Sequence, residues 1–235
     1  MKHLVILFLY ISLAFSTEYY AKLEPVQTYV VKSSVNGKVL FSNDKIEGFT
    51  AKNTKIIEID SIVENLELKQ VNKKIELIKK MIKIENTNYQ RLKKVRTKSA
   101  FDKDLQLLKS LNLESTKADL ISKKEILKNT IKNKNLSEDN RYIYNINVKK
   151  DDYVTPGTIL YETKDLSLGK LEIFVPVSQI DTLKDKTIYL NKKQTNLKID
   201  KIYKVAHSKH ISSYKVDIIV PNPKTFSRLI KIEFK

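Results

Sequence analysis

The sequence of 235 residues predicts a multidomain α+β protein, in which a small split β-domain is interrupted by a long antiparallel α-helical hairpin and followed by a small β-barrel. Three observations predict this arrangement. A short motif occurs twice, with about a hundred residues between the copies. The segment between the copies has a helical pattern, and the C-terminal part consists of short, β-branched segments.

Residues 1–16 are predicted to be a secretory signal peptide. Lys2 precedes an apolar run from Leu4 to Phe15, and the small residue Ser16 follows. This run is shorter than the ~20 residues that a helix needs to span a bilayer. An uncleaved membrane anchor is the alternative, and in either case we expect the rest of the chain to be exported.

The repeated motif indicates that two distant segments form one domain. Residues 45–62 align without a gap with residues 149–166, and Asn53 then lies over Gly157. Both residue types tolerate left-handed backbone conformations, so each is expected to turn the chain. If the two copies pack on each other, they form one β-domain with approximate two-fold symmetry, and both ends of the intervening segment are anchored in it.

The segment between the copies is predicted to form two long helices. It contains neither glycine nor proline between Gly48 and Pro156. Apolar residues recur at steps of three and four, as in a coiled-coil seam. The first seam consists of Leu68, Val71, Ile75, Ile78, Ile82, Tyr89 and Leu92, with Glu85 in one polar position, and the second, less regular seam consists of Phe101, Leu105, Leu108, Leu111, Leu120, Leu127 and Ile131.

A short turn is predicted between the two seams. Ser99 is followed three residues later by Asp102, which resembles a capping box. We therefore expect one helix to end near residues 95–97 and the next to begin at Ser99. Helices joined by so short a turn run antiparallel, and about 35 residues each give a hairpin about 50 Å long.

The remaining segments are predicted to be strands. Residues 28–41 alternate around Asn36–Gly37, a strong signal for a β-hairpin, and Gly48 is expected to mark a further turn. After residue 166, short β-branched segments at regular spacing predict a small barrel or sandwich. These segments are residues 171–177, 186–191, 197–205, 214–222 and 229–235.

The charge of the chain does not by itself indicate nucleic-acid binding. The formal net charge is +17, but only four of the 44 basic residues are arginine. Phosphate and base recognition favours the bidentate arginine fork. The lysines are spread along nearly the whole chain and no nucleic-acid-binding motif accompanies them, so we expect no nucleic-acid partner.

No enzyme or cofactor site is predicted. The chain has no cysteine, no Gly-rich phosphate loop and no Gly-x-Ser-x-Gly motif. His207 and His210 are three residues apart in a segment predicted to be β, where they would point to opposite faces and make a poor metal site. We expect no catalytic residue, no bound metal and no cofactor.

The order of these segments resembles the membrane fusion proteins, or periplasmic adaptor proteins, of HlyD type. The second copy, VKKDDYVTPGTILYETKD, is similar to half of the family's biotinyl-lipoyl-like domain, and LEIFVPVSQIDTLK is similar to the start of its barrel. The resemblance implies a lipoyl-like domain at 26–60 and 141–165, a helical hairpin at 61–137 and a β-barrel at 166–235. Because a hairpin replaces the turn that carries a modified lysine in true carriers, we expect no biotin or lipoyl group.

The resemblance also implies where a partner binds. In the family, an Arg, a Leu, a Ser and an Asp at the hairpin tip engage an outer-membrane channel. Aligned through Ser99, this sequence has Leu92 and Asp104 at family positions, whereas the arginine position is Asn88. Arg91, about one helical turn further on, is the candidate substitute.

The implied function is that of an adaptor in the periplasm of a Gram-negative cell envelope, associated with the inner membrane. It would link an inner-membrane transporter of RND or ABC type to an outer-membrane efflux channel, as a homo-oligomer of six subunits. Cargo and pump type are left open by the sequence. The alternatives are an envelope coiled-coil scaffold that only self-associates and a basic nucleic-acid-binding protein.

A cluster of cations near the predicted tip suggests how the partner would be attracted. It consists of Arg91, Lys93, Lys94, Arg96 and Lys98. This cluster would favour docking onto an acidic channel rim. The general lysine richness of the chain is the alternative explanation.

Overall fold

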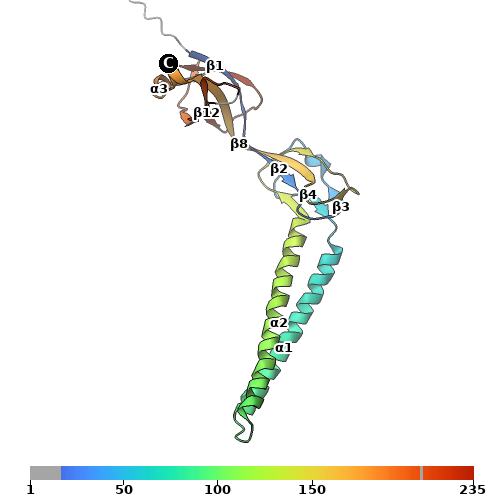
Figure 1. Cartoon of the computed structure of the whole chain (residues 1–235). Helices are drawn as coiled ribbons and strands as arrows, with labels where there is room; N and C mark the ends of the chain where they lie inside the picture. Colours follow the sequence, from blue (N-terminus) through green and yellow to red (C-terminus); the bar gives the residue numbers. More distant parts are fainter. Residues whose placement is uncertain (1–16, 207–208) are drawn as a thin grey trace, which may run out of the picture. The chain divides into compact units, whose positions relative to one another are not determined.

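The computed structural model describes residues 17–206 and 209–235, and it confirms the predicted α+β class (Figure 1). The chain divides into two compact units. Among the described residues, one unit contains 17–29 together with the part of the chain from Lys164 to Lys235, and the other is Val30–Thr163. The predicted signal peptide, residues 1–16, lies outside the described residues.

The β-part of the unit Val30–Thr163 is built mainly from short antiparallel strands. β3, β4, β5 and β7 form a sheet in the order β5-β4-β3-β7, and β6 pairs with β8. The elements are β3 (Gly37–Ser42), the 3₁₀ turn Asp44–Ile46, β4 (Thr54–Ile59), β5 (Asn135–Glu138), β6 (Tyr142–Ile146), β7 (Tyr153–Val154) and the first residues of β8 (Ile159–Pro176).

Both copies of the repeated motif contribute to one hydrophobic core in this unit. Ala51 and Ile56 from the first copy pack in the same cluster as Leu160 and Tyr161 from the second. The Tyr161 hydroxyl donates a hydrogen bond to Glu138 Oε1 at 2.9 Å, and burial, together with the Glu138 carboxylate, raises the pKa of Tyr161. Segments a hundred residues apart in the sequence therefore exclude water from the same interior.

The aligned turn residues occupy similar places in the two copies. Asn53 has φ of 44° and comes directly before β4, and Gly157 has φ of 94° and lies two residues before β8. The Asn53 N–H donates to Asp139 Oδ1 at 2.9 Å, and the Gly157 N–H donates to the Ser33 carbonyl at 2.8 Å. Gly48, with φ of 84°, forms a further turn.

The predicted hairpin at Asn36–Gly37 is wrong. β2 (Glu24–Lys32) pairs with β8, whereas β3, which begins at Gly37, pairs with β4 and β7. A Cβ at residue 37 would lie 2.6 Å from Ile59 Cγ2. The glycine is therefore required by close packing against β4, and the strands on its two sides belong to different sheets.

Two long helices fill the interval between the two copies. α1 (Ile62–Lys93) has 32 residues and α2 (Ala100–Asn133) has 34, and residues 94–99 connect them. α2 begins as predicted: Ser99 is the N-cap, its hydroxyl oxygen accepts a hydrogen bond from the Asp102 N–H at 3.1 Å, and its O–H donates to Asp102 Oδ2 at 3.0 Å. The two helices pack against each other through apolar residues of both.

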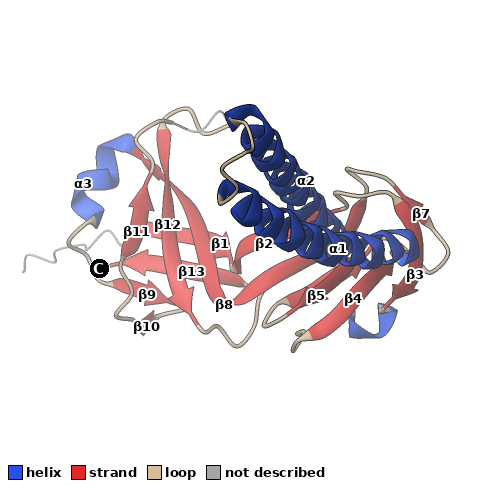
Figure 2. Ribbon diagram, turned by 90° about the horizontal axis from the view of Figure 1, so that it is seen from below, coloured by secondary structure: helices blue, strands red, loops and turns tan. Residues whose placement is uncertain are grey.

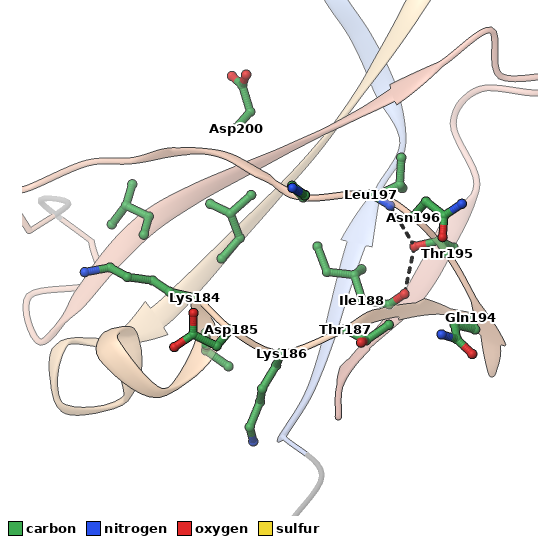
Figure 3. A pocket seen from close by; sticks show the side chains of 14 residues that line it. Lys184, Asp185, Lys186, Thr187, Ile188, Gln194, Thr195, Asn196, Leu197 and Asp200 are labelled. Atoms are coloured by element: carbon green, nitrogen blue, oxygen red, sulfur yellow. Dashed lines mark hydrogen bonds between the residues drawn. The ribbon is translucent and has the colours of Figure 1, made fainter.

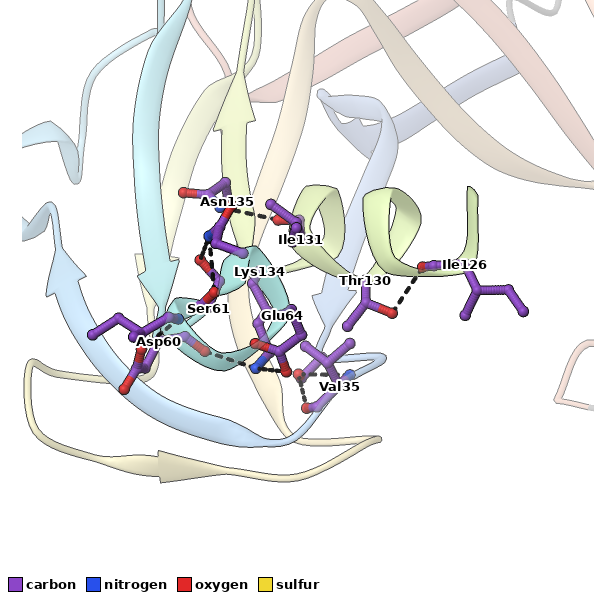
Figure 4. A network of polar contacts seen from close by, with 12 residues as sticks. Val35, Asp60, Ser61, Glu64, Ile126, Thr130, Ile131, Lys134 and Asn135 are labelled. Atoms are coloured by element: carbon purple, nitrogen blue, oxygen red, sulfur yellow. Dashed lines mark hydrogen bonds and ion pairs between the residues drawn. The ribbon is translucent and has the colours of Figure 1, made fainter. Parts of the chain in front are cut away.

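A buried lysine joins the two helices to the β-part of the unit (Figure 4). Lys134, directly after α2, donates from Nζ to the Asp60 carbonyl at 2.7 Å and to Glu64 Oε1 at 2.5 Å. Its backbone carbonyl accepts a hydrogen bond from the Ile59 N–H at 2.7 Å. Burial of the Glu64 carboxyl raises its pKa, but hydrogen bonds and the nearby Lys134 charge outweigh burial, so the net pKa is lowered.

The other unit surrounds a second hydrophobic core with two antiparallel sheets, and α3 (Ile180–Leu183) lies at one end of them (Figure 2). One sheet has the order β1-β13-β9-β10, and the other has the order β11-β12-β8-β2. The remaining strands are β1 (Thr17–Lys22), β9 (Ile188–Leu190), β10 (Lys193–Gln194), β11 (Ile199–Ile202), β12 (Ser213–Pro221) and β13 (Leu229–Phe234).

The predicted small β-barrel is corrected to two open sheets. In the described part of the chain, no pairing joins the edge strands β10 and β11. β10 has only two residues, and β11 has a register shift between Ile199 and Lys201. These edge strands therefore present few regularly placed N–H and C=O groups with which another strand could pair.

The N-terminal strand β1 was not predicted from the sequence. It pairs with β13 along its whole length, and Ala21 is buried in the core of this unit. Residues 26–29, which were expected in the split domain, also belong to this unit. A single strand without flanking turn residues, next to a predicted signal peptide, gives no clear strand signal.

We predict that Lys134→Met destabilises the unit by about 2 kcal/mol at neutral pH, because it leaves the partly buried Glu64 carboxylate without its partner. Because the Glu64 pKa is below its usual value of 4.5, the ion pair contributes fully above that pH and is lost as the pH falls. The difference between the variant and the native protein should therefore shrink at pH 3. Chemical denaturation followed by circular dichroism measures both values.

The double variant Lys134→Met/Glu64→Leu is the control for this prediction, since it removes both charges. It should recover part of the lost stability. An equal loss for the single variant at both pH values would contradict the assigned ion pair.

We predict that Ser99→Ala lowers the free energy of unfolding by about 1 kcal/mol, because the Asp102 N–H loses its acceptor. Ser99→Asp retains an acceptor at this position and should stay close to the native value. Helical circular dichroism during denaturation measures the change. Equal stability of the alanine and native proteins would show that the cap contributes nothing.

Candidate functional site

The connection between α1 and α2, residues 94–99, is the candidate partner-binding site, and it lies at the end of the helices away from the β-strands (Figure 1). α1 ends with backbone hydrogen bonds from the Lys94 N–H to the Arg91 and Leu92 carbonyls. The Val95 N–H also bonds to the Leu92 carbonyl, at 3.1 Å. These bonds tighten the last turn of α1 before the chain reverses.

The four predicted contact residues lie within two turns of this connection and have different surroundings. Arg91 and Asp104 are exposed, whereas Leu92 is half-buried, at the last position of the α1 seam. Ser99 is exposed but already caps α2, so its hydroxyl is engaged. In the described part of the chain, no hydrogen bond or ion pair joins these four residues to one another.

The cluster of cations predicted from the sequence is open to solvent. Arg91, Lys93, Lys94, Arg96 and Lys98 are all exposed. Within residues 17–206 and 209–235, none of them forms an ion pair. An anionic partner surface would therefore meet these charges without first displacing an internal carboxylate.

The interface between α1 and α2 changes character along its length. Toward the β-strands it is apolar, with Val71, Ile75 and Leu127 buried together. Nearer the connection, polar side chains meet.

Two polar contacts lie in this distal part. The Gln106 side-chain amide donates to the Glu85 carboxylate, and the Ser110 hydroxyl donates to Asn86 Oδ1 at 2.6 Å. The polar position that interrupts the predicted α1 seam at Glu85 thus faces a polar residue of α2. Away from its base, the pair of helices is therefore held together by hydrogen bonds as well as by apolar packing.

The first half of the predicted α2 seam is wrong. Leu120 and Leu127 do face α1, but Phe101, Leu105 and Leu108 are exposed. Counting back from Leu127 in steps of seven passes Leu120 and Leu113 and reaches Gln106. This heptad therefore identifies, from the sequence alone, the side of α2 that faces α1.

An open pocket in the other unit is the second candidate (Figure 3). It is lined by residues 183–188, 194–200 and Ile202. Its Thr195 hydroxyl donates to the Ile188 carbonyl at 2.7 Å and accepts from the Leu197 N–H, and Lys184 pairs with Asp181 at 2.9 Å. The Thr195 hydrogen bonds stabilise the local backbone.

Of the two histidines that were considered and rejected as metal ligands, His207 lies outside the described residues. The His210 ring stacks on Phe174, with ring centroids 4.0 Å apart. Within the part that the structure covers, no three His, Asp or Glu side chains gather as metal ligands would. Among the described helices, none combines the length and the apolar character needed to cross a membrane.

Comparison with known proteins shows which solved structures share this architecture. No family model and no curated protein matches the sequence. A solved MacA–MexA chimera that carries the Pseudomonas aeruginosa MexA α-hairpin domain matches with a TM-score of 0.71 and 15% identity, over 94% of this chain and 78% of the chimera.

Two further solved structures are similar. The membrane fusion protein Spr0693 of Streptococcus pneumoniae R6 matches with a TM-score of 0.67 and 10% identity, over 94% of this chain and 99% of its own. MacA of Actinobacillus actinomycetemcomitans matches with a TM-score of 0.56 and 19% identity, over 94% and 78%. The similarity spans both units and the helical pair, and the chain has the fold of the membrane fusion proteins.

Proposed function

We propose that this chain is a non-enzymatic adaptor of a cell-envelope transport system, and that it links an inner-membrane transporter to an outer-membrane channel. One observation carries the proposal. A pair of long helices ends in an exposed cationic connection, and a buried lysine fixes the base of the pair to a β-core that both copies of the repeat build. Such an arrangement presents a binding tip far from the domain that supports it.

The parts of the chain would then have separate tasks. The β-part of the unit Val30–Thr163, which we propose to be lipoyl-like, would pack side by side in a ring of six subunits. The helices α1 and α2 would reach the channel, and the unit that contains residues 17–29 and 164–235 would meet a transporter of RND or ABC type. We place the protein in the periplasm, associated with the inner membrane.

At the tip, we assign contact with the channel to Arg91, Leu92, Ser99 and Asp104. The exposed guanidinium of Arg91 would pair with a carboxylate of the channel, since arginine suits bidentate pairing. Leu92, half-buried at the end of the seam, would supply an apolar contact. Ser99 would act mainly by fixing the start of α2.

The proposal predicts that a photo-crosslinking residue at Leu92 or Ser99 captures an outer-membrane channel protein in cells that produce the chain. Substituting Lys94, Arg96 and Lys98 together by Gln should reduce this crosslink, because the attraction is electrostatic, and raising the salt concentration should weaken it in extracts. Replacing Lys69, Lys73 and Lys80, which are exposed on α1 nearer its base, is the matched control.

Crosslinks from Leu92 and Ser99 only to other copies of the chain would favour the self-associating scaffold and defeat the adaptor proposal. Cytoplasmic fractionation of the chain with nucleic acid would defeat it as well.

A further inference from the structure

The hairpin of β11 and β12 ends in a connection that exposes two apolar side chains. A hydrogen bond from the Tyr203 N–H to the Lys215 carbonyl, at 2.9 Å, extends the pairing of the two strands, and residues 204–212 form the connection beyond it. Within this connection, Val205 is 81% exposed and Ile211 is 83% exposed. Exposed apolar residues that are scattered singly are normal, whereas neighbouring ones mark contacts with another molecule or with a membrane.

The sheet holds both sides of this connection in place. The Tyr203 hydroxyl donates to Asp217 Oδ2 at 3.2 Å, and Lys215 Nζ lies 4.0 Å from the centre of the Tyr203 ring. On the other side, the His210 ring stacks on Phe174, with ring centroids 4.0 Å apart. The two apolar side chains are therefore presented from an ordered base, so contact with another surface costs little further ordering.

A third exposed apolar residue lies at the same end of this unit. Val177 begins the 3₁₀ turn η2 (Val177–Gln179), directly after β8, and it is 44% exposed. Its N–H donates to the Ser212 carbonyl at 3.1 Å, which places η2 against the residue that follows Ile211. We call Val177, Val205 and Ile211 the apolar end.

Lysines accompany the apolar end. Lys204 directly precedes Val205, and Lys209 lies two residues before Ile211. Both lysines are exposed. Residues 203–212 contain no Asp or Glu, so this connection combines apolar side chains with positive charge alone.

The carboxylates of neighbouring elements do not cancel this charge. Glu172 on β8 pairs with Lys215 at 3.4 Å, and Asp217 on β12 is buried. Residues 180–187, which follow η2, contain two Lys and two Asp and so add no net charge. A negatively charged surface would therefore meet the lysines of the connection without strong repulsion from these elements.

The apolar run of the N-terminal sequence joins the chain at this same end. The run from Leu4 to Phe15 stops two residues before Thr17, the first residue of β1. The Tyr19 hydroxyl of β1 donates to Gln179 Oε1 at 3.2 Å, in the same 3₁₀ turn as Val177. An apolar run that stays attached would hold this end of the unit against a bilayer, and if the run is removed, the apolar end is a contact that remains.

We propose that the apolar end inserts into the interface of a bilayer that contains anionic lipid. Val177, Val205 and Ile211 would enter the boundary between headgroups and acyl chains, and Lys204 and Lys209 would bind lipid phosphates with their ammonium groups while their methylene stems lie along the apolar layer. This inference rests on the proposed function, in which the chain is associated with the inner membrane, and it specifies the surface that makes the contact.

Fluorescence of the full chain on vesicles tests the inference. Because the chain has no cysteine, a single cysteine in place of Val205 or Ile211 can carry the fluorophore NBD, whose emission rises when it leaves water. The matched control is Leu229, which is 68% exposed but pairs with Lys22, at the other end of β1. On vesicles of phosphatidylglycerol and phosphatidylcholine, we expect emission to rise, and to be quenched by spin-labelled lipid, at residues 205 and 211 but not at residue 229.

A second measurement shows whether the lysines contribute. With the probe at Ile211, the variant Lys204→Gln/Lys209→Gln should lower the equilibrium constant for insertion about tenfold, because lysines near an anionic surface are attracted to it. The variant Lys192→Gln/Lys193→Gln removes two exposed lysines from the β9–β10 hairpin and should leave insertion unchanged.

The outcomes separate this inference from the proposed function. Equal emission at residues 205, 211 and 229, or equal insertion into vesicles of phosphatidylcholine alone, overturns the inference. A benzophenone at Ile211 that captures a protein and no lipid in cells overturns it as well. The vesicles contain neither transporter nor channel, so a failure of Leu92 and Ser99 to capture a channel would overturn the adaptor proposal and leave the vesicle result unaffected.

Discussion

The arrangement of this protein depends on the buried ammonium group of Lys134. It lies where both helices leave the β-strands, and it bonds to the Asp60 carbonyl before α1 and to the Glu64 carboxylate in the first turn of α1. The backbone N–H of Lys134 closes the last turn of α2, and its backbone carbonyl accepts a hydrogen bond from the Ile59 N–H. A buried charge is costly unless all its partners are in place, so this residue fixes the two helix ends at one point. Gly37 supports the same point, because only a residue without Cβ leaves room for Ile59 there.

A hairpin fixed in this way at its base needs less cohesion at its tip. The apolar contacts between α1 and α2 are concentrated toward the base, around Ile75 and Leu127. Farther out, the Glu85–Gln106 and Asn86–Ser110 hydrogen bonds set which residues face each other. Polar pairs inside a coiled coil specify register and reduce stability. The distal half therefore has a defined register, although several of its larger apolar side chains, those of Phe101, Leu105 and Leu108, are exposed.

The sequence predicts most reliably the features that local chemistry determines. The α1 seam, the Ser99 cap and the turn at Asn53 each depend on a few neighbouring residues, and the structure has all three. The α2 seam could not be predicted by hydrophobicity alone, because near the tip the apolar residues do not face α1. The prediction of a hairpin at Asn36–Gly37 was wrong because an Asn-Gly pair usually signals a turn. Here the glycine is required by close packing against Ile59, more than twenty residues away in the sequence. The open sheets around β10 and β11 likewise depend on pairing between strands, which single-sequence patterns do not specify.

The interrupted repeat explains why so long an insertion is tolerated. Each copy alone offers only a few core side chains, such as Ile56 and Ile57 in one and Leu160 and Tyr161 in the other. Only together do they bury enough apolar surface to form a core, so the segment between them must leave and return at neighbouring points. Two antiparallel helices satisfy that condition at any length, since each turn added to one is matched by a turn added to the other. The β-core therefore fixes where the hairpin begins, and the chain is free to place the exposed tip as far away as the helices extend.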